Sequence, residues 1–321
     1  MPYEDKNNVA IIGGGPSGLA AALWLKNYGM IPVIIEKEDV LGGLQSKSLV
    51  SNTWLLGWQA VLGVDVAKAF EKHIKYEKIQ SILSSLLLGI YREETGGFLL
   101  KIRKGVEDIE LRASYVIIAT GTSFAGADWA DSINGGSHVK DKIHVGTASY
   151  TDTQKWYSNS PLIIGGGDSA VECALFLQSR GMNPIIISRS GIKAGTLLKN
   201  RLRLERSKGS ISVRENSEVK KLESRDNKII VQLREGDSIE TGAIFLMFGY
   251  KPNTDLIGLF SDDREIVLTK DGCFHVDENC MTSIENVYAI GDVANGKDRC
   301  VAVAQAMGTI AARHISTKAN T

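Results

Sequence analysis

The stretch VAIIGGGPSGLA at residues 9–20 decides the fold of this chain. Its apolar start is typical of a buried strand, and the apolar run after the glycines indicates a helix. Gly13 permits a sharp turn out of the strand, Gly15 lets a pyrophosphate approach the backbone, and Gly18 lets the helix pack on the strand. The next apolar strand ends at Glu36, whose carboxylate suits the ribose hydroxyls of an adenosine. The unit therefore predicts a dinucleotide site, with a plain βα turn that needs glycine for packing as the alternative.

The same unit occurs a second time, as LIIGGGDSAVE at residues 162–172. Gly165, Gly167 and Ala170 stand at the three positions of the pattern, and alanine is an accepted third residue. Unbroken apolar strands in both units indicate parallel sheets that are buried on both faces. The repeat predicts an α/β fold with two Rossmann-like domains. Short antiparallel strands are expected beside these sheets, at residues 98–103 with 110–112 and 211–213 with 229–234.

The strand after the second glycine turn ends on Ser188 and Arg189 instead of an acid. A carboxylate there repels the 2′-phosphate of NADPH, whereas serine and arginine bind it, and Lys193 is a further candidate. We therefore expect NADPH at this unit, with NADH less favoured. The alternative is that Arg189 is only a solvated strand end.

Composition bounds the other classes of function. The chain carries 37 basic and 37 acidic side chains, so its zero net charge argues against nucleic acid or an anionic membrane as the main partner. No apolar run approaches the roughly 18 residues of a membrane span, and residues 1–8 lack a signal-peptide pattern. We expect a soluble, cytoplasmic protein. Neither C-x-x-C nor zinc-like spacing occurs, so we expect no metal site from Cys173, Cys273, Cys280 and Cys300.

Several further segments share their pattern with one known family. They are Gly42-Gly43 with 52–57, and residues 116–121, 248–254, 287–292 and 299–308. Together with the glycine turns, they resemble the thioredoxin reductase family of flavoproteins over nearly the whole chain. The resemblance implies a discontinuous FAD-binding domain at residues 1–119 and 248–321, with an NAD(P)H-binding domain inserted at 120–247. It also implies a homodimer.

The segment VYAIGD at residues 287–292 indicates a ligand contact by its own chemistry. A short apolar strand that ends in Gly291 and Asp292 delivers a carboxylate to a ligand hydroxyl, which the resemblance identifies as the ribityl chain of FAD. The alanine-rich helix that follows presents the positive end of its dipole, which suits the negative charge of a reduced flavin. The alternative is that Asp292 serves only as a helix N-cap.

The glycine turns and the resemblance together give two sets of candidate cofactor-binding residues. The FAD set is Gly13, Gly15, Pro16, Ser17, Gly18, Glu36, Lys37, Gly43, Leu44, Trp54, Thr120, Gly121, Gly291, Asp292, Cys300 and Val301. The nicotinamide set is Gly165, Gly167, Asp168, Ser169, Ala170, Ser188, Arg189 and Lys193.

The chain departs from the thioredoxin reductase pattern where that family keeps a C-x-x-C pair. The corresponding residues 148–151 read ASYT and contain no sulfur. Thiol–disulfide exchange needs a thiolate, so we expect no thioredoxin reductase activity. The catalytic residues stay open. Weak candidates are Cys300, at the start of the helix expected at residues 299–308, and His144, just before residues 148–151. The alternative for Cys300 is an incidental small residue, and the alternative for His144 is a histidine whose hydrogen bonds are satisfied within the protein.

Residues 189–208 form a basic stretch, with seven lysines and arginines and one acid, Glu205, a local net charge of 7 − 1 = +6. One interpretation is a solvated face. The other is a phosphate site that continues into a docking patch for a small acidic electron carrier, such as ferredoxin or flavodoxin.

The leading hypothesis is an FAD-dependent NAD(P)H oxidoreductase that passes electrons from the flavin directly to ferredoxin, flavodoxin, a quinone or another small acceptor. Thioredoxin-reductase-like ferredoxin–NADP reductases are the nearest branch that works without the cysteine pair. The alternative is an FAD-binding protein that does not use NAD(P)H, as a ferredoxin-fed enzyme or as a non-catalytic sensor or interaction module.

Overall fold

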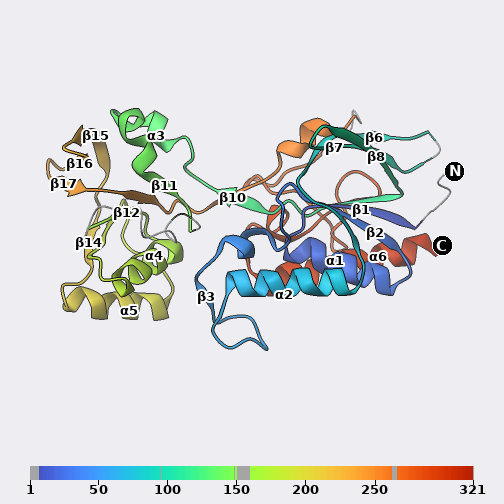
Figure 1. The fold of residues 1–321 in the computed structure, drawn as a ribbon, viewed down its shortest axis with the longest axis horizontal. Coiled ribbons are helices and arrows are strands. Elements are labelled where there is room, and N and C mark those ends of the chain that lie inside the picture. Colours follow the sequence, from blue (N-terminus) through green and yellow to red (C-terminus); the bar gives the residue numbers. More distant parts are fainter. Residues whose placement is uncertain (1–6, 95, 148, 150–159, 262–265, 321) are drawn as a thin grey trace. The chain divides into compact units, whose positions relative to one another are not determined.

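The computed structural model describes residues 7–94, 96–147, 149, 160–261 and 266–320. The chain divides into two compact units, the first formed by Met1–Ser123 with Pro252–Thr321 and the second by Phe124–Lys251. It passes between the units through β10 (Thr122–Phe124) and β19 (Tyr250–Pro252), which pair with each other (Figure 1). The boundaries expected from the sequence, after residues 119 and 247, fall before these connecting strands.

The first unit is built on a five-stranded parallel sheet in the order β20-β9-β1-β2-β5. Its strands are β1 (Asn8–Ile12), β2 (Ile31–Ile35), β5 (Gln80–Ile82), β9 (Tyr115–Ile118) and β20 (Val287–Ala289). Helices α1 (Pro16–Asn27), α2 (Gly63–Tyr76) and α6 (Val301–Ala319) pack on one face of this sheet. An antiparallel sheet lies on the other face, formed by β6 (Ser85–Arg92), β7 (Phe98–Lys104) and β8 (Glu107–Ala113).

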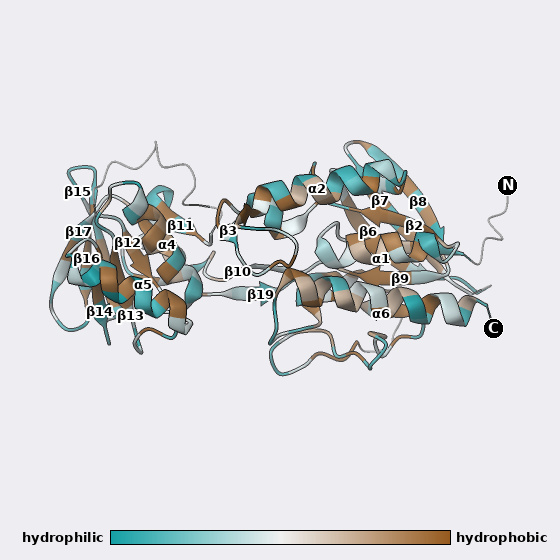
Figure 2. Cartoon of the chain, turned by 90° about the horizontal axis from the view of Figure 1, so that it is seen from below, coloured by the Kyte–Doolittle hydropathy of each residue, from teal (hydrophilic) through white to brown (hydrophobic). Residues whose placement is uncertain are grey.

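Alternation along β1 explains why an unbroken apolar strand is needed here. Val9 and Ile11 pack in the cluster that includes Leu25 of α1 and Ile315 of α6. Ala10 and Ile12 pack in the opposite cluster, which includes Leu100 of β7. Successive side chains of a strand point to opposite faces, so both faces of β1 are buried. Figure 2 shows β9, which pairs with β1 in this sheet, as hydrophobic.

The second unit repeats this plan with a parallel sheet in the order β11-β18-β12-β13-β14. Its strands are β11 (Ile143–Val145), β12 (Leu162–Ile164), β13 (Ile185–Ser188), β14 (Ser212–Glu215) and β18 (Ile244–Leu246). The helices are α3 (Trp129–Ser132), α4 (Asp168–Ser179) and α5 (Thr196–Ser207). An antiparallel sheet is formed by β15 (Val219–Arg225), β16 (Lys228–Leu233) and β17 (Ser238–Thr241).

Several minor elements lie between the sheets and helices. They are β3 (Ser51–Asn52), β4 (Val61–Leu62) and the 3₁₀ helices η1 (Gly43–Lys47), η2 (Gly136–Lys142), η4 (Asp255–Leu259) and η5 (Gly291–Val293). In the part of the chain that the structure describes, no helix has both the length and the apolar character to cross a bilayer.

The prediction of antiparallel strands is confirmed in the first unit and is partly wrong in the second. Residues 98–103 and 110–112 lie in the antiparallel pair β7–β8. Residues 212 and 213, by contrast, belong to β14, which pairs in parallel with β13, while β16 pairs with β15 and β17. The polar, alternating sequence of β14 belongs to the edge strand of a parallel sheet, where one strand edge faces solvent.

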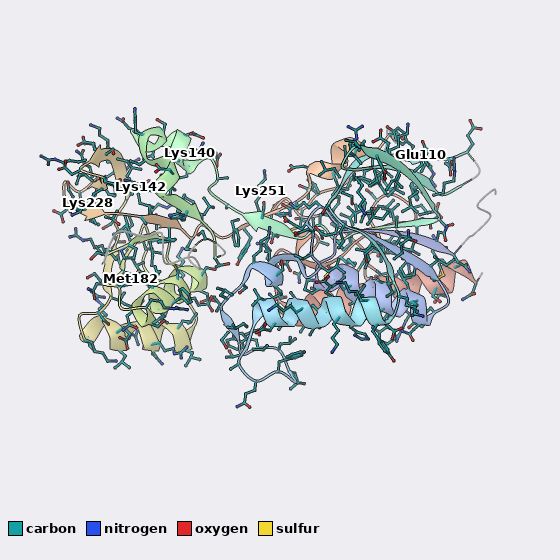
Figure 3. The ribbon with its side chains drawn as sticks, in the orientation of Figure 1. Glu110, Lys140, Lys142, Met182, Lys228 and Lys251 are labelled. Atoms are coloured by element: carbon teal, nitrogen blue, oxygen red, sulfur yellow. The ribbon has the colours of Figure 1, made fainter. Side chains whose placement is uncertain are left out.

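An ion pair and a hydrogen bond from two surface lysines hold short elements of the second unit together. Lys140 Nζ lies 2.7 Å from a carboxylate oxygen of Asp131, which joins η2 to α3. Lys142 Nζ donates to the backbone oxygen of Asn227 at 2.7 Å, which ties the end of η2 to the β15–β16 turn. Both lysines are labelled in Figure 3. Exposed pairs of this kind each contribute at most about 1 kcal/mol.

Candidate functional site

The first glycine turn joins β1 to α1 and requires glycine for steric reasons. Gly13 has φ +113°, and a Cβ there would lie 2.3 Å from the carbonyl oxygen of Ala119. Gly18 lies in the first turn of α1, where a Cβ would lie 2.2 Å from the carbonyl oxygen of Gly13. Because β1, β9 and α1 approach one another closely at this turn, only glycine fits at these two positions, as the spacing of the glycines predicts.

Gly15 is different, because it faces open space. It is the N-cap residue of α1, Pro16 and Ser17 follow it, no side chain caps the helix and no acid lies in the first turn. The nearest atom to a Cβ on Gly15 would be the Cα of Gly43, at 3.9 Å. Free N–H groups at an uncapped helix N-terminus suit a pyrophosphate.

Glu36 is fixed beside this turn by two backbone donors. Its side chain is only 7% exposed. Oε2 accepts a hydrogen bond from the N–H of Gly14 at 2.6 Å, and Oε1 accepts one from the N–H of Glu38 at 2.9 Å. Each carboxylate oxygen keeps a lone pair for a further donor, such as a ribose hydroxyl. The neighbouring Lys37 is exposed.

The loop after β2 places Gly43 and Leu44 near the same turn. Gly42 N–H donates to the carbonyl oxygen of Gly14 at 2.8 Å. Gly43 has φ +58°, and a Cβ there would approach the Cα of Gly15 to 3.0 Å. Leu44 is half-buried in η1. Trp54 lies further along, with its side chain 82% exposed.

Asp292 and Arg299 form a second part of the candidate FAD site. Asp292 lies in η5, after β20, and burial raises the pKa of its carboxyl while Arg299 opposes that shift. A Cβ on Gly291 would lie 2.5 Å from Ser17 Oγ, so this segment touches the start of α1. Because the N-cap residue of α6 is Cys300, Asp292 does not cap that helix.

Arg299 carries a buried donor without a partner. In the described residues, its Nε has no hydrogen-bond acceptor, while its Nη2 donates to the Cys273 sulfur at 4.0 Å and its charge acts on the Asp292 carboxyl. A buried unsatisfied N–H costs about 1–3 kcal/mol. A ligand with acceptor atoms, such as the flavin ring system, would satisfy it, so the residues present fit FAD. Next to it, Cys300 is exposed and Val301 is buried, and α6 has no acid in its first turn.

The residues Thr120 and Gly121 are held by Asn253, which lies in the segment 248–254 but was not predicted as their partner. Thr120 Oγ1 donates to the Asn253 carbonyl oxygen at 2.8 Å, and Asn253 Nδ2 donates to the Thr120 carbonyl oxygen at 2.8 Å. The N–H of Asn253 donates to the Gly121 carbonyl oxygen at 3.0 Å. This reciprocal pairing joins the strand that leaves the first unit to the strand that returns.

The second glycine turn has the same geometry. Gly165 has φ +152°, and a Cβ there would lie 2.5 Å from the carbonyl oxygen of Met247. Gly167, the N-cap residue of α4, has no atom within 4 Å of a Cβ position. Ala170 is fully buried, and Asp168 Oδ1 accepts the N–H of Gly195 at 2.7 Å. The Asp168 carboxylate thus anchors the start of α5 to this turn.

The expected phosphate residues lie on a loop that contacts the second turn. Ser188 Oγ donates to the Gly191 carbonyl oxygen at 2.8 Å, and the N–H of Lys193 donates to the Gly166 carbonyl oxygen at 2.7 Å. The side chains of Arg189 and Lys193 are exposed. Two cations therefore stand beside an uncapped helix N-terminus, which fits a nicotinamide dinucleotide with a 2′-phosphate.

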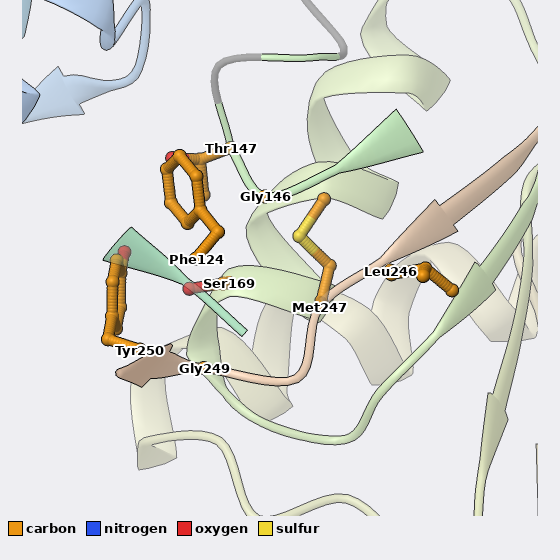
Figure 4. Close-up of a pocket in the computed structure, with 8 residues that line it drawn as sticks. All are labelled: Phe124, Gly146, Thr147, Ser169, Leu246, Met247, Gly249 and Tyr250. Atoms are coloured by element: carbon orange, nitrogen blue, oxygen red, sulfur yellow. The ribbon is translucent and has the colours of Figure 1, made fainter. Parts of the chain in front are cut away.

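A small pocket adjoins the same turn (Figure 4). It is lined by Phe124, Gly146, Thr147, Ser169, Leu246, Met247, Gly249 and Tyr250. The rings of Phe124 and Tyr250 lie 5.4 Å apart, and a Cβ on Gly146 would meet the Phe124 ring at 2.0 Å. Ligands of open α/β sheets bind beyond the carboxyl ends of the strands, where this pocket lies. These aromatic residues were missed because they come from segments far apart in sequence.

The four cysteines and the candidate catalytic residue His144 do not come together in one site. All four cysteines are free, and only Cys300 is exposed. Burial raises the pKa of the Cys173 thiol and that of the Cys280 thiol, the latter to about 11. His144 lies in β11, where it stacks on Phe245 at 5.0 Å and burial lowers its pKa. Of residues 148–151, only Ser149 is among those described. The described residues contain no His, Cys, Asp and Glu cluster suited to a metal ion.

Comparisons with known proteins agree with this geometry. The model of the pyridine nucleotide-disulphide oxidoreductase family matches residues 7–308. The chain is 26% identical to a 34.2 kDa protein in the rubredoxin operon of Clostridium pasteurianum, with 97% of each covered. It is 26% identical to a ferredoxin–NADP reductase of Ligilactobacillus salivarius, covering 96% of this chain and 89% of the relative. A thioredoxin reductase structure from Lactococcus lactis matches with a TM-score of 0.81 and 23% identity, over 98% of this chain and 99% of that one.

The matched range contains both glycine turns and the segment that ends in Asp292. The predicted fold, two Rossmann-like domains with the second inserted into the first, is confirmed, and so are FAD and NADPH as the cofactors. The resemblance to thioredoxin reductases is confirmed as well. The chain is an oxidoreductase that belongs to the pyridine nucleotide-disulphide oxidoreductase family.

Proposed function

We propose that this chain is an FAD-dependent NADPH oxidoreductase that delivers electrons directly from the flavin to an acceptor other than thioredoxin. When bound, NADPH supplies a hydride and FAD receives it and passes the electrons on. The observation that carries the proposal is the pair of uncapped helix N-termini, at Gly15 and Gly167, each beside a fixed set of polar groups. The same chain thus offers two dinucleotide sites of different chemistry.

In the first unit, the N-terminus of α1 binds the pyrophosphate of FAD. Glu36 binds the adenosine ribose through the carboxylate that Gly14 and Glu38 orient. Asp292 accepts a ribityl hydroxyl. The Nε of Arg299 finds its missing acceptor on the ring system, and its positive charge, with the N-terminus of α6, stabilises negative charge there.

In the second unit, the N-terminus of α4 binds the pyrophosphate of NADPH, and Arg189 and Lys193 bind the 2′-phosphate. Arginine suits this role because its planar guanidinium donates two parallel hydrogen bonds to a phosphate. The side chain of Phe124 forms part of the wall of the pocket that Ser169 also lines.

The acceptor is proposed from the sulfurs and from the relatives. Three of the four cysteines are buried, and residues 148–151 contain no cysteine, which supports an electron route without a dithiol relay. The relative from Ligilactobacillus salivarius is named a ferredoxin–NADP reductase. Helix α5 presents Leu197 and Leu204, 62% and 56% exposed, among its arginines and lysines, a surface suited to a small acidic electron carrier. A homodimer is proposed on the resemblance alone.

The direct test is an anaerobic titration of the FAD-loaded protein with NADPH and, separately, with NADH. We expect about one equivalent of NADPH to bleach the flavin rapidly, because hydride transfer needs only the two bound cofactors. A flavin that stays oxidised with both nucleotides, but is reduced by reduced ferredoxin, would instead support the ferredoxin-fed alternative.

Replacement of all four cysteines tests the route by which electrons leave. The variant Cys173→Ala, Cys273→Ala, Cys280→Ala, Cys300→Ser is expected to keep NADPH–dye and NADPH–ferredoxin turnover within about twofold, because no thiolate takes part. Cys300→Ser alone, at an exposed position, is the matched single variant. Loss of turnover in either variant, with FAD still bound, would show that a cysteine belongs to the electron path.

A further inference from the structure

The loop that carries the expected phosphate residues has an anchor from a neighbouring strand. The N–H of Ile192 donates to Glu215 Oε1 at 3.3 Å. This bond adds to the two that hold Ser188 to Gly191 and Lys193 to the second glycine turn. A carboxylate from β14 is therefore built into the loop that contains Arg189.

Glu215 lies beside the end of β13, the position at which the ribose-binding acid of other Rossmann folds is absent from this chain. In Rossmann folds, a carboxylate at the end of the strand after the glycine turn binds the ribose 2′-hydroxyl of NADH. In this chain that strand, β13, ends at Ser188. Glu215 is its partner in the parallel register of β13 and β14. The missing carboxylate is thus supplied one strand further along the same sheet edge.

The charge of Glu215 is not neutralised by an ion pair. The side chain is exposed, and among the described residues no lysine or arginine forms a salt bridge with it. Its neighbour Arg214 is engaged by Asp237, at 2.7 Å. Oε1 faces Ile192, and Oε2 stays available to a donor such as a hydroxyl. The negative charge of Glu215 therefore lies against the loop that carries the positive charges of Arg189 and Lys193.

We propose that Glu215 is a specificity-determining residue of the nicotinamide site, which moves the protein from strict NADPH use toward use of both NADPH and NADH. Its carboxylate accepts the ribose 2′-hydroxyl of NADH and repels the 2′-phosphate of NADPH, which Arg189 and Lys193 attract. This inference rests on the proposed function, because it requires the nicotinamide dinucleotide to bind at the second glycine turn.

The test uses Glu215→Gln, which keeps an oxygen for the N–H of Ile192 and removes the charge. Isothermal titration of the FAD-loaded protein gives dissociation constants for 2′,5′-ADP and for 5′-ADP, the adenosine parts of NADPH and NADH. We expect Glu215→Gln to bind 2′,5′-ADP about tenfold more tightly and 5′-ADP no more tightly than wild type, since one repulsive charge is removed. The gain should shrink as salt rises.

Two variants separate this role from general charge and from loop structure. Glu240→Gln removes an exposed acid of β17 that pairs with Lys228, and should leave both constants unchanged. Glu215→Ala loses the anchor of Ile192 as well as the charge, so 5′-ADP should bind more weakly than to Glu215→Gln.

The possible outcomes discriminate between the inference and the proposed function. If Glu215→Gln strengthens both nucleotides equally, or leaves their ratio unchanged, the specificity role of Glu215 is wrong while the nicotinamide site stands. If wild type binds neither nucleotide, the nicotinamide site and this inference fail together.

Discussion

Gly15→Val is expected to weaken FAD binding by about 100-fold while leaving the fold of the chain intact. Gly15 has φ −78° and ψ 177°, an extended conformation that valine adopts readily, and no atom lies closer than 3.9 Å to its Cβ position. The added side chain would instead occupy the space at the N-terminus of α1 where a pyrophosphate must approach. Loss of two hydrogen bonds to a charged group, each about 1.5 kcal/mol or more, weakens FAD by about 100-fold.

The measurement is the amount of FAD retained per chain after gel filtration, followed by reconstitution with added FAD. Circular dichroism and thermal unfolding of apo-protein report the fold independently. Gly258→Ala is the matched control, because Gly258 also has no atom within 4 Å of a Cβ position but lies in η4. Full FAD occupancy in Gly15→Val, with an intact fold, would contradict the assignment of the first glycine turn to FAD.

A contrasting change shows why this position is informative. Gly13→Val would place a Cβ 2.3 Å from the Ala119 carbonyl oxygen, in a backbone conformation that valine avoids. That variant should lose stability whether or not FAD is present. Gly15 therefore reports on ligand binding, and Gly13 reports on the packing of β1 against β9.

The sequence predicted the parts of the structure that depend on local pattern. The two glycine turns, the apolar strands beside them and the carboxylate of Glu36 all follow from short segments in which spacing determines backbone geometry. Gly13 and Gly165 have positive φ and a neighbouring backbone within reach, so no other residue fits. For these elements, pattern and packing require the same residues.

The features that escaped prediction depend on strand register between distant segments. Residues 211–213 were expected in an antiparallel pair, because their polar alternation is typical of one. The parallel partner of β14 is β13, and only that register brings Glu215 beside Ser188. The Asn253 clamp on Thr120 and the ring pair Phe124–Tyr250 likewise join residues more than a hundred positions apart. Spacing within one segment carries no signal for such contacts.

Arg189→Ala is expected to weaken NADPH binding by about 10- to 100-fold and to leave NADH binding within about twofold. A bidentate hydrogen bond from arginine to a phosphate contributes roughly 1.5–3 kcal/mol, and NADH has no 2′-phosphate to lose it. Arg189 is exposed at the end of β13 and lies outside the hydrogen bonds that hold the loop, which run through Ser188, Ile192 and Lys193. Its removal should therefore leave the loop in place.

Anaerobic flavin reduction at varied nucleotide concentration gives both affinities with the FAD-loaded protein. Arg189→Lys is the informative companion, because lysine keeps the charge but loses the planar pair of donors, so it should recover only part of the NADPH affinity. Arg203→Ala removes an exposed arginine of α5, further along the same basic stretch, and should affect neither nucleotide. If Arg189→Ala weakens NADPH and NADH equally, Arg189 shapes the loop and does not bind the phosphate. If it changes neither, the phosphate is held by Lys193 alone, and Lys193→Ala should then show the whole NADPH-specific loss.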